Sequence, residues 1–514
     1  MIVDPAQSSI TGDMDVEALR RYGHQIVDWI ADYLANGTKE VSVLSQALPG
    51  DIRRSLPVGP PLLPESMETI LADIDRVVMP GITHLNSGRF MGYFSVGSSG
   101  PSILGDMFDS VLDVTRMLWR TSPAATELEQ VTLDWLRQML GLPGPLFGML
   151  HHNSAIINAL VAARETIQNL HIRQHGMAGR SEVPRLRCYA SEEAHSSIEK
   201  AAIVLGLGQD GLRKIGTDNM FRMDVEQLER AITEDIRDGW YPFAVVATVG
   251  TTSTASVDPV ECIADICERY GLWLHVDAAY AGAAAIVPNF RWVLAGCERA
   301  DTLTINPHKW LFTSFGCSVF YTRRPDIVKS TFNLTPDYLQ SAEGEQDEAI
   351  NLMDYDAALP HRFPALRLWM VMRYFGQHGL IARISEHCHL ALILSQWVEE
   401  IANFELMAPT LLSVVCFRAH PYGMDDEEQL NILNEHVMNR VNATGRYFLS
   451  HTKVRGKVTL RVAIGNIRTT EADVHGIWEA IQAALRAELG LVKGFWSSSR
   501  QGVLRVVRLS CYAL

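Results

Sequence analysis

A lysine and an aspartate stand where the sequence predicts that buried strands end. Lys309 follows the run 300–305, which is rich in β-branched residues, and Asp277 is the last residue of the apolar run 272–277. Burial at such a position lowers the pKa of an amine, and an uncharged amine can attack a carbonyl carbon as a nucleophile. A lysine at a strand end can also extend its ammonium to water, so Lys309 alone leaves both interpretations open.

Two further predicted strands are followed by polar side chains. The run 186–190 precedes His195, and the run 243–249 precedes Thr252. Because ligands of a parallel α/β sheet bind at the carboxyl ends of its strands, we expect these side chains to meet the lysine and the aspartate in one crevice. An amine, a buried carboxylate, an imidazole that stacks on a ring and a hydroxyl are the groups needed by pyridoxal 5′-phosphate (PLP), whose pyridine nitrogen the carboxylate keeps protonated.

Three motifs extend this interpretation to a family. Residues 306–310 read NPHKW, residues 275–280 read HVDAAY, and residues 194–197 read AHSS. Together they resemble the PLP-dependent aromatic-L-amino-acid decarboxylases (group II decarboxylases), with a similarity that runs over about residues 15–489. The resemblance implies an α/β fold of fold-type I with a mostly parallel sheet in a large domain. It also implies decarboxylation of an aromatic L-amino acid to the corresponding arylalkylamine and carbon dioxide.

The resemblance further implies roles for individual residues. The expected catalytic residues are Lys309, His195 and Tyr338, of which the tyrosine would reprotonate Cα. The residues expected to hold the cofactor are Asn153, Ser154, His195, Thr252, Asp277, Ala279, Asn306, His308 and Lys309. Those expected to line the substrate pocket are Leu85, Tyr93, Phe94, Val96, Thr115, Met117 and Pro360. Arg461 matches an arginine of the family, but the match indicates no role for it.

Two departures from the family pattern leave alternatives open. His151 and His152 stand in the expected phosphate turn, where small residues are common, and this stretch looks about two residues short. A PLP-silent scaffold protein is therefore one alternative. The family often has tryptophan in place of Leu85 and glycine or serine in place of Pro360, so the choice among tryptophan, tyrosine, phenylalanine and dihydroxyphenylalanine stays open.

Two other reactions belong to similar proteins. In the subfamily that performs oxidative decarboxylation–deamination to an aromatic acetaldehyde, a phenylalanine usually replaces the tyrosine, so Tyr338 argues against this reaction. Aminotransfer occurs on the same fold, but the motif around Lys309 resembles that of the decarboxylases.

The elements that position these residues can also be read from the sequence. Alternating strand and helix patterns over 186–321 predict right-handed crossovers and a mostly parallel sheet. Ser196 and Glu199 have the spacing of a capping box, which would fix the preceding histidine at a helix start. Apolar spacing predicts helices over 15–35 and after Pro64, which cannot bury their apolar faces alone. The resemblance implies that these helices pack on a partner subunit in an obligate homodimer.

We expect four parts along the chain. Residues 1–99 form an N-terminal helical dimerisation segment, and residues 100–370 form a large PLP-binding domain that includes a mobile catalytic loop at 331–355. Residues 371–490 form a small C-terminal α/β domain, and residues 491–514 form a tail to which we assign no function.

Composition excludes several other classes. The chain of 514 residues has a net charge of −14 and no long basic run, which argues against a nucleic-acid partner. No apolar stretch approaches the ~20 residues that cross a bilayer, and the N-terminus lacks the pattern of a secretory signal. Eight cysteines without a Cys-x-x-Cys pair favour reduced thiols in a cytoplasmic enzyme. His171 and His175 lack a third ligand of suitable spacing, so we expect no metal site.

Overall fold

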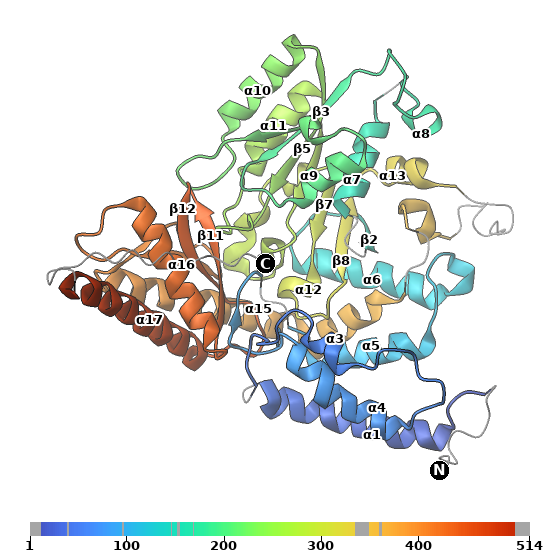
Figure 1. Ribbon diagram of the computed structural model, residues 1–514. Helices are drawn as coiled ribbons and strands as arrows, with labels where there is room; N and C mark the ends of the chain where they lie inside the picture. The colour runs from blue at the N-terminus through green and yellow to red at the C-terminus, as the bar shows by residue number, and fades with distance from the viewer. Residues whose placement is uncertain are drawn as a thin grey trace.

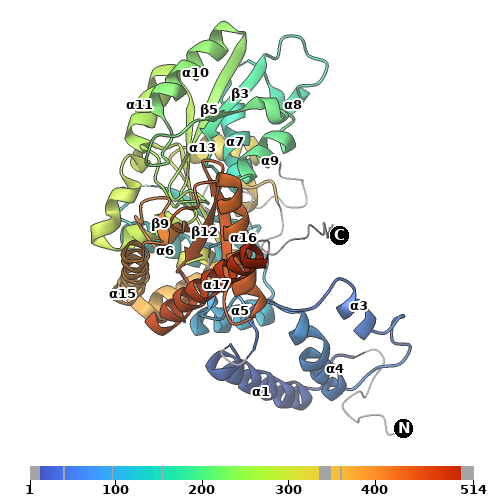
Figure 2. The same ribbon diagram turned by 60° about the vertical axis from the view of Figure 1, so that its left-hand side comes forward.

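The computed structural model describes residues 12–38, 41–94, 97–144, 146–151, 155–167, 169–334, 349–358 and 362–498, with side chains as far as residue 490. The chain forms an N-terminal arm, a large layered α/β unit and a smaller unit built on a second sheet (Figures 1 and 2). Within these ranges, no helix combines the length and the apolar character needed to span a bilayer.

The N-terminal arm projects from the rest of the chain (Figures 1 and 2). It contains α1 (Val16–Asp32), α3 (Asp51–Ser55) and α4 (Met67–Asp73). The Tyr22 hydroxyl donates to Glu68 over 2.5 Å, and the Trp29 indole donates to Asp75 over 3.0 Å, so α1 lies beside the second helical stretch. Several large apolar side chains of the arm remain exposed in the single chain: Leu19, Ile26, Trp29, Leu62, Leu63, Ile70 and Ile74.

A seven-stranded sheet forms the centre of the large unit. Its order is β2-β8-β7-β6-β5-β3-β4. The strands are β2 (Phe147–His151), β3 (Arg185–Ser191), β4 (Leu212–Ile215), β5 (Trp240–Thr248), β6 (Trp273–Asp277), β7 (Thr302–Ile305) and β8 (Ser318–Thr322). The neighbours from β4 to β7 pair in parallel, and β8 pairs antiparallel with both β7 and β2. The prediction of a mostly parallel sheet in an α/β fold is confirmed.

The helices of the large unit lie around this sheet, and α7, α10 and α11 pack directly on its strands (Figure 1). They are α5 (Gly100–Leu112), α6 (Pro123–Met139), α7 (Ala155–Glu165), α8 (Ile172–His175), α9 (Ser197–Val204), α10 (Val225–Arg237), α11 (Val260–Tyr270), α12 (Pro307–Trp310), α13 (Pro325–Phe332) and α15 (Pro364–Glu400). The Ser122 hydroxyl caps α6 by accepting from the Ala125 amide, as the serine–proline pair predicts. The long helix α15 is kinked at Gly376, which has φ 61°, and packs on α5 and α6 as well as on the smaller unit.

The smaller unit contains a five-stranded sheet of order β1-β11-β12-β10-β9. Its elements are β1 (Phe90–Met91), β9 (Phe404–Leu406), β10 (Val414–Ala419), α16 (Glu427–Ala443), β11 (Phe448–Val454), β12 (Lys457–Ala463) and α17 (Glu471–Ser498). Strand β1 comes from the N-terminal segment and pairs in parallel with β11. Helix α17 continues to Ser498, so it passes the boundary that we expected at residue 490.

Candidate active site

Lys309 lies in the one-turn helix α12, directly after β7. Its amide donates to the Asn306 carbonyl over 2.9 Å, and its Nζ lies 5.1 Å from the centroid of the Phe94 ring. Burial lowers the pKa of Lys309; the negative charge of Asp277 opposes this shift, and the positive charge of Arg461 adds to it. Burial therefore shifts the amine toward its uncharged state, which is the state that acts as a nucleophile.

Asp277 ends β6, opposite Thr248 of β5 and Thr304 of β7. The residue is 6% exposed, and its Oδ1 accepts from the Ala279 amide over 3.1 Å. No side chain in the described ranges forms an ion pair with it within 4.0 Å. A buried carboxylate is costly without a positive partner, so this position suits a ligand that brings a protonated nitrogen.

His195 lies between β3 and α9, where its hydrogen bonds differ from those that the sequence predicted. The Ser196 side chain makes no capping bond, so the predicted capping box is wrong. Instead the Ser197 amide donates to His195 Nδ1 over 3.2 Å, and the Ser197 hydroxyl lies 2.7 Å from the same atom. Nδ1 is thus an acceptor, which places the proton of the neutral ring on Nε2. Burial and the charge of Lys309 lower the pKa of His195, although Asp277 opposes them.

Thr252 stands in the turn after β5, with its side chain exposed. The neighbouring Thr251 is buried, and its hydroxyl lies 3.1 Å from Thr254 Oγ1 and 3.2 Å from Ser256 Oγ. Gly250 has φ 91°, and a Cβ there would come within 2.6 Å of the Ala281 Cβ, so the turn requires glycine. These contacts hold the turn while Thr252 faces outward.

Two side chains fix the loop that carries the lysine. Asn306 Oδ1 accepts from the Ser318 hydroxyl over 2.5 Å, and the Asn306 amide donates to the Ala279 carbonyl over 3.1 Å. His308 Nδ1 lies 2.6 Å from the Cys317 carbonyl, so Nδ1 carries a proton and donates it. Burial lowers the pKa of His308 to about 4, which keeps its ring neutral.

Comparison with known proteins agrees with this geometry. The sequence pattern of the pyridoxal-dependent decarboxylase conserved domain matches residues 49–420. The chain belongs to the pyridoxal-dependent decarboxylases. Tyrosine decarboxylase 2 of Arabidopsis thaliana is 38% identical over 482 residues, which cover 91% of this chain and 87% of the relative. Phenylacetaldehyde synthase of the same plant is 36% identical over 479 residues, which cover 91% of this chain and 96% of that one. A crystal structure of Oryza sativa TDC with PLP and tryptamine matches with a TM-score of 0.88 and 34% identity over 93% of this chain and 99% of that chain.

The decarboxylase is therefore a carboxy-lyase of fold-type I whose cofactor is PLP. Its described residues fit that cofactor. The buried carboxylate of Asp277 matches the pyridine nitrogen, the amine of Lys309 matches the aldehyde, and the accessible ring of His195 matches the flat face.

A column of rings, not predicted from the sequence, backs the lysine of the decarboxylase. We call Phe94, Tyr280, Trp310 and His387 the aromatic column. Phe94 stacks on Tyr280 with centroids 3.9 Å apart, and Tyr280 stacks on Trp310 with centroids 4.8 Å apart. The Trp310 indole donates to His387 Nδ1 over 2.9 Å. Tyr280 and Trp310 belong to the two motifs that identified the family, but their mutual contact depends on the fold.

Arg461 joins the smaller sheet of the decarboxylase to the site. It is 3% exposed on β12; its Nε donates to the Ser253 carbonyl over 3.0 Å, and its Nη1 donates to the Tyr93 carbonyl. Its guanidinium carbon lies 4.8 Å from the centroid of the Phe94 ring. The sequence match gave no role for Arg461, because both carbonyls come from segments more than 200 residues away in the chain.

The residues expected to line the substrate pocket lie in different surroundings. The ring of Phe94 lies beside Lys309. The ring of Tyr93 packs instead on Phe90 and Phe448, with centroids 6.2 and 5.6 Å away. Three others accept hydrogen bonds through their main-chain carbonyls. The Leu85 carbonyl accepts from the Asn466 side chain, the Thr115 carbonyl from the Thr121 hydroxyl, and the Met117 carbonyl from the Met353 amide. Five expected site residues lie outside the described part of the chain: Val96, Asn153, Ser154, Tyr338 and Pro360.

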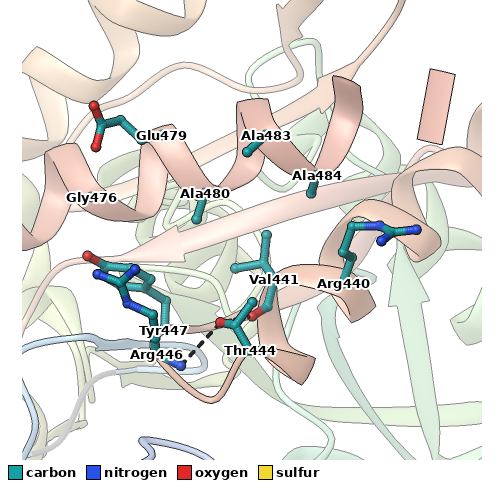
Figure 3. Close-up of a pocket in the computed structure, with 10 residues that line it drawn as sticks. All are labelled: Arg440, Val441, Thr444, Arg446, Tyr447, Gly476, Glu479, Ala480, Ala483 and Ala484. Carbon is teal, nitrogen blue, oxygen red and sulfur yellow. Dashed lines mark hydrogen bonds between the residues drawn. The ribbon is translucent and has the colours of Figure 1, made fainter. Parts of the chain in front are cut away.

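A pocket of about 410 Å³ in the smaller unit is separate from this site (Figure 3). It lies between α16, the loop after it, and α17, where Ala480 and Ala484 leave room. The Arg446 amide donates to the Thr444 hydroxyl over 3.2 Å at its edge. None of the residues that line this pocket belongs to the crevice around Lys309.

Proposed function

We propose that this decarboxylase converts an aromatic L-amino acid into the corresponding arylalkylamine and carbon dioxide. The observation that carries the proposal is the amine of Lys309, whose pKa is lowered by burial, beside both the carboxylate of Asp277 and the ring of Phe94. When bound, PLP supplies an electron sink for the bond that breaks. The names of the relatives support an aromatic substrate, since they include a tyrosine decarboxylase and a phenylacetaldehyde synthase.

Each residue of the crevice has a part in this proposal. Asp277 would keep the pyridine nitrogen protonated, and Lys309 would supply the amine for the aldehyde. The ring of His195, with its proton on Nε2, would cover a face of the cofactor. The remaining members flank the cofactor, support the lysine loop or hold the phosphate: Thr252, Ala279, Asn306, His308, Asn153 and Ser154. The chain also has to hold the Cα–carboxylate bond perpendicular to the ring plane, which positions it for cleavage.

The pocket favours flat apolar side chains over acidic ones. Phe94 and the rest of the aromatic column present an apolar wall. Arg461 lies near this wall; its Nε and Nη1 are bound to main-chain carbonyls, and its Nη2 has no partner within the described residues, so it offers one donor and no matched pair to an acidic side chain. A second carboxylate on the substrate would be buried without a matched partner, at a cost of several kcal/mol.

A panel of substrates tests the proposal. Purified protein with PLP is supplied with tryptophan, tyrosine, phenylalanine, dihydroxyphenylalanine or glutamate, and both amine and carbon dioxide are quantified. We expect release from at least one aromatic substrate, and none from the Lys309→Ala variant. Faster turnover of glutamate than of every aromatic substrate would refute the pocket assignment, and a wild-type protein that binds no PLP would favour the scaffold alternative.

Oxidative decarboxylation–deamination is the second candidate function. It is favoured by the similarity to a phenylacetaldehyde synthase. Tyr338 favours the amine instead, since a phenol can return a proton to Cα, whereas the phenylalanine usual in the aldehyde-forming subfamily cannot. Quantification of aldehyde and peroxide in the same assays distinguishes the two products.

The active form is a homodimer in the cytoplasm. The exposed apolar side chains on the arm support a partner subunit, because a monomer would leave them in water. We retain the four-part division of the chain and the catalytic loop at 331–355 as part of this proposal.

A further inference from the structure

Tyr93 has an unusual backbone conformation directly before Phe94. Its φ of 53° lies in the left-handed region, which is uncommon for a bulky residue other than glycine. Packing of its side chain contributes little to holding this conformation, because Tyr93 is 64% exposed and its ring only lies beside those of Phe90 and Phe448. Such a conformation persists where the surrounding structure holds it, and it occurs most often at functional sites.

Two residues of the smaller sheet hold the backbone of Tyr93. The Tyr93 amide donates to the Ser450 hydroxyl over 3.2 Å, and Arg461 Nη1 donates to the Tyr93 carbonyl. Ser450 of β11 and Arg461 of β12 are paired in the sheet register, and both are buried. The two bonds fix the planar peptide groups on either side of Tyr93, and with them the φ and ψ angles between those planes.

The chain reaches this point along the edge of the smaller sheet. Strand β1 pairs in parallel with β11, and the last pair joins Met91 to Leu449. A Cβ on Gly92 would come within 2.2 Å of Cε1 of Phe448, so a larger residue there would require that ring to move. The left-handed conformation of Tyr93 then turns the chain out of the strand.

This turn determines where the ring of Phe94 lies. The ring stacks on Tyr280 with centroids 3.9 Å apart, and its centroid lies 5.1 Å from Lys309 Nζ. The guanidinium carbon of Arg461 lies 4.8 Å from the same centroid. A change of Tyr93 to a negative φ would redirect the chain and carry this ring away from the lysine.

We propose that Ser450 is a positioning residue for the substrate pocket. Together with Arg461, it holds Tyr93 in the left-handed region. The ring of Phe94 then stays beside Lys309, where it forms the apolar wall for an aromatic side chain. The smaller sheet thus sets the fit of the pocket without touching the substrate. This inference rests on the proposed function, in which the substrate is an aromatic amino acid.

Removal of the Ser450 hydroxyl tests the inference. In the PLP-loaded enzyme, Ser450→Ala removes the acceptor for the Tyr93 amide, so the left-handed conformation is held less firmly. We expect the KM of the preferred aromatic substrate and the inhibition constant of its amine product to rise by about 3- to 10-fold, the effect of one lost neutral hydrogen bond. The kcat should change less, because the hydroxyl acts on the pocket wall. Ser450→Thr keeps a hydroxyl and should restore both constants.

Thr459→Val is the matched control. Thr459 is a buried residue of β12, and its hydroxyl donates to the Lys457 carbonyl of the same strand over 3.1 Å. The substitution therefore removes a buried hydroxyl from the same sheet without loss of a bond to Tyr93, and it should leave the KM unchanged. If Ser450→Ala also leaves the KM unchanged, or if Ser450→Thr fails to restore it, the inference is wrong.

The backbone conformation of Tyr93 allows a second test. Asparagine adopts the left-handed region more readily than tyrosine does, so it depends less on a partner that holds it there. The rise in KM caused by Ser450→Ala should therefore be smaller in a Tyr93→Asn protein than in the wild type. An equal rise in both backgrounds would show that the hydroxyl does not act through this conformation, and would overturn the inference.

Two further outcomes are separated by design. If Ser450→Ala does not fold, Ser450→Cys must raise the KM instead, because its sulfur is only a weak acceptor, and an unchanged KM overturns the inference. A wild-type protein that turns over no aromatic amino acid refutes the proposed function itself. Hydrogen exchange of the Tyr93 amide then tests the hold on the backbone: exchange must be faster in Ser450→Ala than in the wild type, and equal rates refute that hold.

Discussion

Effects of opposite sign act on the pKa of the Lys309 amine. Burial and Arg461 both lower its pKa, whereas Asp277 raises it. The position therefore differs from that of a lysine whose ammonium extends into water, which was the other interpretation of its place after a strand.

Removal of the charge on Arg461 should shift this balance. In Arg461→Gln we expect the pKa of Lys309 to rise, so that less of its amine is uncharged at neutral pH. The rate at which PLP attaches to the apoenzyme should fall at pH 7, and its dependence on pH should move to higher pH. Arg418→Gln is the control, since Arg418 is an equally buried arginine of the smaller sheet but pairs with Glu405 and Glu427. Equal pH profiles for all three proteins would contradict the role of Arg461.

Tyr338 should decide the product. After carbon dioxide leaves, Cα must receive a proton, and a phenol near it can supply one. Tyr338→Phe cannot supply this proton, so we expect part of the substrate to be oxidised by O2 instead; with one water per turnover, this gives aldehyde, ammonia and hydrogen peroxide in place of the amine. The measurement is the yield of amine and of peroxide against oxygen uptake in both proteins. If the amine yield is unchanged and no peroxide forms, the proton comes from another group, with His195 the next candidate.

At the scale of elements, the strands that carry the site could be predicted from the sequence. Strands β3, β5, β6 and β7 lie within a few residues of the predicted apolar runs, because buried parallel strands read as continuous apolar stretches. The rule that ligands bind at their carboxyl ends then placed Lys309 near Asp277, which the charge interaction between them supports.

Features that depend on contacts distant in sequence could not be predicted. Strand β1 pairs with β11 across more than 350 residues, and a two-residue strand has no periodicity to detect. The capping box failed because the Ser197 hydroxyl and amide are engaged by His195 instead. The contact between His151 and Asp356 likewise joins residues 205 positions apart in the chain.

The N-terminal arm should be needed for association. Ile26 and Ile70 are exposed apolar residues on α1 and α4. We expect Ile26→Asp/Ile70→Asp to shift the protein from dimer to monomer in sedimentation velocity and to reduce activity, because charges would then be buried at the interface. Ile432→Asp, at an exposed site on α16, is the control and should leave the dimer intact. A wild-type protein that is monomeric and active would contradict the proposed dimer.

At the scale of the whole molecule, three buried histidines make the fold sensitive to acid. Burial lowers the pKa values of His275, His308 and His387 to about 4. The folded state keeps these rings neutral, whereas the unfolded chain protonates them below a pKa of about 6.5. The free energy of unfolding therefore falls as the pH drops from about 6.5 toward 4, by up to about 1.4 kcal/mol per pH unit for each histidine. Burial raises the pKa of Asp258 to about 6, which acts in the opposite direction and offsets only part of this loss.

We therefore expect the Tm of the protein to be lower at pH 5 than at pH 7. His387→Asn keeps an acceptor for the Trp310 indole but cannot be protonated, so the difference in Tm between the two pH values should become smaller. The check is scanning calorimetry of both proteins at the two pH values. A Tm that is unchanged or higher at pH 5 would show that other titrating groups dominate.

The central claim is that Lys309 holds the cofactor in the crevice at the carboxyl ends of the parallel strands. The most direct test is to reduce the PLP-loaded protein with borohydride, digest it and locate the modified lysine by mass spectrometry. We predict that the cofactor is attached to the peptide containing Lys309, and that the Lys309→Ala protein carries none. Attachment to a different lysine in the wild-type protein, or the same level of attachment in Lys309→Ala, would contradict the claim.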